Sequence, residues 1–113
     1  KIKGRSELEA KRLVEEALAF EQAGAFGILL EGTLSNVASE ITRQVRVPVV
    51  GIGSGAEVDG QVLVWSDMLG FFEDFKPKFV KRYLEGAALV RKGVQSYTNE
   101  VKNKIFPSSE FCY

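Results

Sequence analysis

The feature that most constrains the fold is a pair of short apolar runs, residues 25–30 and 47–52, with a helix-patterned segment between them. Neither run alternates, and each is too short for a buried helix, so both predict strands covered on both faces. A strand, a helix and a second strand in this order form a right-handed parallel crossover. A third run, 61–64, predicts a third strand. The sequence therefore predicts an α/β fold with a parallel sheet.

Helical segments flank these strands. A capping box and apolar residues at helical spacing predict a helix over about 7–23, closed by Gly24. Ser35 offers a cap for a second helix. Two further helices are predicted over about 77–89 and 92–102. The apolar face of the second helix is expected to hold Val37, Ala38, Ile41 and Val45.

The chain length and the number of strands predict an incomplete barrel. With 113 residues the chain is at most one domain, and three parallel strands cannot close a barrel of about eight strands. We therefore expect a single partial barrel domain over 1–113 that is the C-terminal part of something larger. Its βα units are expected in 1–70, and its C-terminal helices and tail in 71–113.

Composition excludes several classes of function. Fifteen Lys and Arg balance fifteen Asp and Glu, so neither a nucleic-acid partner nor a membrane partner is expected. No apolar run approaches the roughly 20 residues of a spanning helix, and the one cysteine, Cys112, cannot form an internal disulfide. We expect a cytoplasmic location, or the mitochondrial matrix in a eukaryote. Because the chain has no histidine, acid–base chemistry falls to carboxylates, lysines or tyrosines.

Two features at strand ends are candidates for chemistry. Glu31 ends the first strand, the position where barrel enzymes keep catalytic groups, although a solvated loop acid or a helix cap has the same pattern. The glycine-rich loop of Gly53, Ser54 and Gly55 follows the second strand, where backbone N–H groups can approach an anion. A tight structural turn is equally consistent with this loop, and Ala56 breaks the spacing of a dinucleotide-binding motif.

Acidic and aromatic residues around the third strand are secondary candidates. Asp59 and Asp67 flank that strand and could position a substrate, although acids beside turns are more often solvated or capping. An aromatic cluster is expected to pack in the core or against another subunit. It consists of Trp65, Phe71, Phe72, Phe75 and Phe79.

Several sequence blocks together resemble the ketopantoate hydroxymethyltransferase family, in order and over nearly the whole chain. The blocks are residues 2–5, 21–26, 29–31, 47–55, 59–64, 67–70, 77–83 and 106–107. The resemblance implies strands six to eight of a (β/α)8 TIM-type barrel. It also implies an enzyme of pantothenate biosynthesis that uses magnesium and methylenetetrahydrofolate to add a hydroxymethyl group to a 2-oxo acid, 3-methyl-2-oxobutanoate.

The resemblance also implies roles for individual residues. Glu31 matches the glutamate that accepts a proton, and we expect substrate contacts from Gly53, Ser54 and Gly55. The magnesium ligands of the family lie in its N-terminal half, so no metal ligand is carried over to this chain. Ser66 stands where the family usually has a histidine. A cysteine-valine-proline-like stretch of the family is replaced by the residues Gly32, Thr33 and Leu34.

Two functions from different classes follow. In the first, the chain belongs to a hydroxymethyltransferase, is inactive as an isolated fragment, and forms a homo-oligomer or pairs with a complementing N-terminal half. In the second, it is a non-catalytic remnant or interaction module that assembles through its aromatic C-terminal helices. The retained Glu31 favours the first, whereas Ser66 and the absent metal-binding half favour the second.

Overall fold

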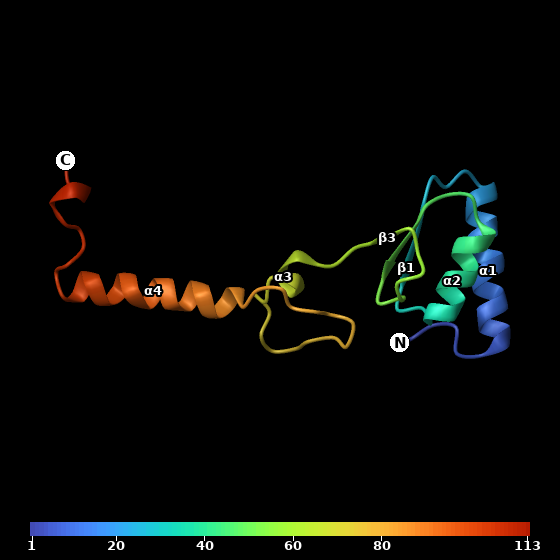
Figure 1. Ribbon diagram of the computed structural model, residues 1–113, viewed down its shortest axis with the longest axis horizontal. Helices are drawn as coiled ribbons and strands as arrows, with labels where there is room; N and C mark the ends of the chain where they lie inside the picture. The colour runs from blue at the N-terminus through green and yellow to red at the C-terminus, as the bar shows by residue number, and fades with distance from the viewer. The chain divides into compact units, whose positions relative to one another are not determined.

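The computed structural model describes residues 1–113, which form two compact units, Lys1–Leu63 and Val64–Tyr113 (Figure 1). The first unit holds, in chain order, α1 (Glu7–Gln22), β1 (Ile28–Glu31), α2 (Ser35–Gln44), β2 (Val49–Ile52) and β3 (Gly60–Gln61). The second unit holds α3 (Trp65–Met68), α4 (Gly86–Lys102) and the 3-10 turn η1 (Ser109–Phe111). None of the helices has the length and apolar character needed to cross a bilayer.

The sheet of the first unit is parallel throughout, with the strand order β1-β2-β3. Ile28 pairs with Val49 where the two strands begin, and Glu31 pairs with Ile52 where they end. Because α2 connects β1 to β2, the predicted parallel crossover and the predicted α/β fold are confirmed. The third strand is shorter than the predicted run 61–64, since only Gly60 and Gln61 pair with β2.

The core of the first unit lies between α1, α2 and one face of the sheet (Figure 1). Successive side chains of a strand point to opposite faces, so Ile28 and Leu30 are buried in this core while Leu29 is 63% exposed. The prediction that both faces are covered is therefore wrong for β1 within this unit, because both helices pack on the same face. The core residues are Ala17, Ile28, Leu30, Val37, Ala38, Ile41, Val45 and Val49.

The two helices of this unit begin differently. At α1 the Ser6 hydroxyl accepts a hydrogen bond from the Glu9 amide at 3.2 Å, and the Glu9 carboxylate accepts one from the Arg5 amide at 3.0 Å, which confirms the predicted start. At α2 the prediction of Ser35 as the cap is wrong. Ser35 is already the first helical residue, and Leu34 occupies the cap position without a side-chain hydrogen bond.

The second unit departs most from the sequence-based prediction. The helix predicted over 77–89 is absent, and one continuous helix, α4, begins only at Gly86. Tertiary contacts hold the preceding loop instead: the Tyr83 amide donates to the Met68 carbonyl at 2.8 Å, and the Arg82 guanidinium donates to the Phe72 carbonyl at 2.6 Å. A Cβ added at Gly86 would collide with the Leu69 carbonyl, so α4 begins where its backbone closely approaches the end of α3.

Candidate functional site

The carboxyl ends of β1 and β2 lie side by side. Glu31, the last residue of β1, pairs in register with Ile52, the last residue of β2. The glycine-rich loop 53–55 therefore emerges next to the loop that follows Glu31. Parallel strands place their carboxyl ends at one edge of the sheet, and active sites of α/β enzymes form there. The predicted juxtaposition of Glu31 with the glycine-rich loop is confirmed, while the roles of these residues stay predictions.

The Glu31 side chain is exposed, and its carboxylate makes no hydrogen bond or ion pair within the chain. It belongs to the sheet face opposite the helices, since the neighbouring Leu30 is buried in the core and strand residues alternate. The alternative that Glu31 caps α2 is wrong, because the cap position is Leu34 and no side chain bonds the first turn of that helix. The carboxylate is therefore free to meet an external group.

The turn after Glu31 is held by backbone hydrogen bonds on two sides. Gly32 adopts a left-handed conformation with φ +61°, and its amide donates to the Ile52 carbonyl at 2.9 Å. On the other side, the Lys3 amide donates to the Gly32 carbonyl at 2.8 Å, and the Leu34 amide donates to the Lys3 carbonyl at 3.0 Å. The N-terminal segment therefore lies along this turn and restrains it.

Ser54 is the most buried polar residue at this edge, with 1% of its surface exposed. Its hydroxyl accepts a hydrogen bond from the Thr33 amide at 3.2 Å and donates to the Leu30 carbonyl at 3.0 Å. The hydroxyl is thus engaged inside the chain, and only the backbone of loop 53–55 is left to contact a ligand. This use of Ser54 and the burial of Thr33, which is 5% exposed, were not predicted from the sequence.

The flanking glycines shape this loop. Gly53 and Gly55 both have positive φ, of 62° and 85°, which favours glycine at each position. A Cβ on Gly55 would lie 2.5 Å from the Ser35 Cβ, so the loop sits directly against the first turn of α2. The Gln61 side-chain amide donates to the Gly55 carbonyl at 2.8 Å and holds the loop from the β3 side. The sequence predicted a strand at Gln61 but not this side-chain contact.

The two secondary acidic candidates have separate places in the fold. The Asp59 carboxylate accepts a hydrogen bond from the Val49 amide at 2.8 Å, and the Asp59 amide donates to the Val49 carbonyl at 3.0 Å. Asp59 therefore fastens the start of β2, which is the capping alternative rather than a substrate contact. Asp67 and Ser66 lie in α3 of the second unit.

The predicted aromatic cluster forms only in part. Trp65 and Phe71 pack edge to face with their ring centroids 5.5 Å apart. All five side chains remain exposed: Trp65 and Phe71 by 63% and 39%, and Phe72, Phe75 and Phe79 by 51%, 66% and 45%. Most of this aromatic surface is therefore not buried within the chain.

An open apolar groove follows the outer edge of β1, the edge that no strand of this chain pairs. Leu13 and Ala17 of α1 form one wall, Ile28 and Leu30 the other. Glu31 lines the same groove at the carboxyl end of the strand. Just beyond β1, Lys3 pairs with Thr33 in an isolated parallel bridge and also lines the groove, so Glu31 lies where the unpaired edge of β1 meets the N-terminal segment.

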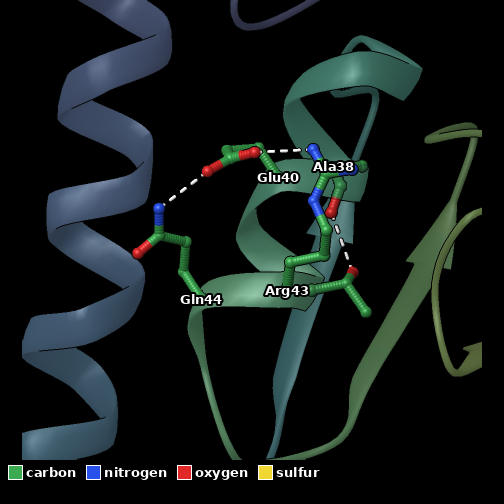
Figure 2. Close-up of polar contacts among 5 residues, drawn as sticks. Ala38, Glu40, Arg43 and Gln44 are labelled. Atoms are coloured by element: carbon green, nitrogen blue, oxygen red, sulfur yellow. Dashed lines mark hydrogen bonds and ion pairs between the residues drawn. The ribbon is translucent and has the colours of Figure 1, made fainter.

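Glu40 on α2 is held by hydrogen bonds to two neighbouring side chains of the same helix (Figure 2). A hydrogen bond from Gln44 at 2.7 Å and a charged hydrogen bond from Arg43 at 2.6 Å hold the pKa of the Glu40 carboxyl below its ordinary value. No three His, Cys, Asp or Glu side chains converge on one point. The side chains of residues 1–113 therefore do not fit a magnesium site.

Comparison with known proteins adds the family. A family profile described as Ketopantoate hydroxymethyltransferase matches residues 1–109. The 3-methyl-2-oxobutanoate hydroxymethyltransferase of Campylobacter concisus (strain 13826) is 94% identical over all 113 residues, which cover 42% of that protein. The protein of the same name from Campylobacter curvus (strain 525.92) is 74% identical, with 42% covered, and that from Campylobacter fetus subsp. fetus (strain 82-40) is 60% identical, with 43% covered. The chain therefore spans less than half the length of these curated relatives.

Proposed function

This chain belongs to the ketopantoate hydroxymethyltransferase family, and from that premise we propose that it supplies strands six to eight of a (β/α)8 barrel enzyme. The enzyme would make ketopantoate from 3-methyl-2-oxobutanoate and methylenetetrahydrofolate. The parallel sheet with an unpaired β1 edge supports this proposal, because further parallel strands can continue it there. The chain covers only 42% of the length of the C. concisus relative, which also supports the proposal that it supplies part of a larger enzyme.

The observation that carries the proposal is the free carboxylate of Glu31 at the carboxyl end of β1, beside the glycine-rich loop. The reaction requires removal of the proton on C3 of the oxo acid, next to its carbonyl group. A carboxylate removes that proton well when its pKa is raised by partial desolvation. We propose that Glu31 is this base and that the rest of the barrel shields it from water.

Water would supply the hydroxyl oxygen to the methylene carbon carried by the folate, and the carbanion left at C3 would form a bond to that carbon. Both bonds from that carbon to the folate nitrogens break, so the carbon becomes the hydroxymethyl group and tetrahydrofolate leaves. We propose that the backbone of Gly53, Ser54 and Gly55 contacts the oxo acid from the neighbouring strand end. Backbone N–H groups of such a loop can approach an anionic substrate closely, since glycine has no Cβ. The magnesium ligands would lie in the part of the enzyme outside these residues.

A second candidate function rests on a different observation, the exposed apolar surface of α4. Leu89, Val90, Val94, Tyr97 and Val101 are 43–58% exposed. Large exposed apolar surfaces mark contacts with other chains. This surface of α4 would serve a non-catalytic interaction module that assembles through its C-terminal helices. It would equally serve homo-oligomerisation of the enzyme.

The test uses a chimera in which these 113 residues replace the matching segment of the C. concisus relative, which is 94% identical over that segment. The chimera should form ketopantoate, whereas the isolated chain should form none, because a barrel site draws residues from many strands. Within the chimera, Glu31→Gln should reduce both kcat and the exchange of the C3 proton with heavy water by about 10²–10⁴-fold. The exchange is measured without folate, by NMR of the oxo acid.

The matched control is Glu15→Gln, which removes an exposed carboxylate from α1, away from the strand ends, and should leave the exchange rate unchanged. Parent-like exchange in Glu31→Gln would show that the base lies elsewhere. An inactive but folded chimera would favour the interaction module.

A further inference from the structure

Ser54 holds the backbone on both sides of Glu31. Its hydroxyl donates to the carbonyl of Leu30, the residue before Glu31, at 3.0 Å. It also accepts from the amide of Thr33, two residues after Glu31, at 3.2 Å. The glycine-rich loop of β2 is therefore fastened across the end of β1 by one side chain.

This hydroxyl is well placed to fix geometry. A serine hydroxyl has one proton to donate and lone pairs to accept. The shorter donor contact is to the Leu30 carbonyl at 3.0 Å, with the Ile52 carbonyl of its own strand at 3.3 Å, and the oxygen accepts from the turn that follows β1. Ser54 is 1% exposed, so water cannot readily replace these bonds. The Thr33 amide has no other partner in the chain. Without the hydroxyl, this buried amide would lose its acceptor, and the turn after Glu31 would be held only by the backbone bonds of Gly32 and Leu34 to Ile52 and Lys3.

The carboxylate of Glu31 itself is not held by any group of the chain. Its direction is set by the backbone from which it projects, which the Ser54 bonds restrain. We infer that Ser54 is a positioning residue, whose hydroxyl orients Glu31 toward the C3 proton and does not touch the substrate. The inference rests on the proposed role of Glu31 as the base, and it concerns the Ser54 hydroxyl alone, since the proposed substrate contact of this loop is made by its backbone.

The test compares Ser54→Ala with a matched hydroxyl deletion, Thr42→Val, in the chimera. The Thr42 hydroxyl also donates to a backbone carbonyl, that of Ala38, at 2.8 Å, but from the last turn of α2. Ser54→Ala should slow C3 proton exchange and kcat by about 10-fold, because small misplacement of a catalytic group is costly, while KM stays near the parent value. Thr42→Val should leave exchange unchanged. Ser54→Cys, which retains a weak donor and acceptor, should recover part of the loss and carries the test if the Ala variant does not fold.

A double variant separates positioning from direct binding. If Ser54 acts through Glu31, adding Ser54→Ala to Glu31→Gln should cause no further loss of exchange. An additional loss in that background, a rise in KM alone, or parent-like exchange in Ser54→Ala would overturn the inference. Parent-like exchange of the C3 proton in Glu31→Gln would instead refute the proposed function and the positioning role together. A large loss of exchange in Glu31→Gln, combined with no loss in Ser54→Ala, would refute the positioning role alone.

Discussion

Replacement of Gly55 by alanine should destabilise the first unit by two separable effects. The first is backbone strain, because Gly55 has φ +85° and an L side chain is disfavoured in that region. The second is a clash, because the new Cβ would lie 2.5 Å from the Ser35 Cβ and 3.1 Å from the Ser35 Cα. Both distances are shorter than an ordinary van der Waals separation, so α2 and the loop would have to move apart.

The magnitude follows from comparison with Gly24. Gly24 has φ +95° but no atom within 4 Å of the added Cβ, so Gly24→Ala isolates the strain, about 1–2 kcal/mol. Gly55→Ala should add an overpacking cost of about 1–3 kcal/mol to a similar strain, for a total loss of about 2–5 kcal/mol. Removing the facing Cβ with Ser35→Gly should recover most of the overpacking cost, although the α-carbon of residue 35 would still lie 3.1 Å from the new methyl group.

The assay is urea unfolding of the chimera, monitored by circular dichroism. It compares four variants: Gly24→Ala, Gly55→Ala, Ser35→Gly and the double variant Gly55→Ala/Ser35→Gly. We expect the pair to be more stable than the sum of its single variants predicts. Strict additivity would refute the packing of the loop against α2. Equal losses in Gly24→Ala and Gly55→Ala would refute the clash.

Two further predictions concern the core and the surface of α2. Ile41→Ala should lower the free energy of unfolding by about 2–5 kcal/mol, because Ile41 is fully buried, whereas Leu8→Ala, at a site on α1 that is 80% exposed, should cost far less in urea unfolding of the chimera. Equal losses would contradict the assignment of the buried face. Gln44 and Arg43 lower the pKa of Glu40, so its ionised form favours the folded state. This contribution is present above the unfolded-state pKa and is lost as pH falls through the lower folded-state pKa. Glu40→Gln should therefore flatten the acid limb of stability measured against pH, and an unchanged acid limb would show that these hydrogen bonds do not persist in solution.

The local sequence was sufficient to predict the order and type of the elements in the first unit. Periodicity and caps act over a few residues, so α1, β1, α2 and β2 were found within a few residues of their observed bounds. The place of Glu31 followed from the same information, since the carboxyl ends of parallel strands share one edge. The family was predicted too, because separate sequence blocks agree in order.

Tertiary structure decided what depends on residues far apart in the chain. The helical pattern of 77–89 was overridden because the loop bonds back to Met68 and Phe72, and α4 begins where Gly86 meets the end of α3. The role of the Ser54 hydroxyl was equally hidden, since its partners Leu30 and Thr33 lie 24 and 21 residues away in the sequence. The local sequence, a serine between two glycines, does not distinguish a side chain that faces a ligand from one that bonds to a neighbouring strand end. Only the parallel pairing of β1 with β2 brings those partners within hydrogen-bonding distance, because pairing joins segments that are distant in sequence and no local pattern encodes it.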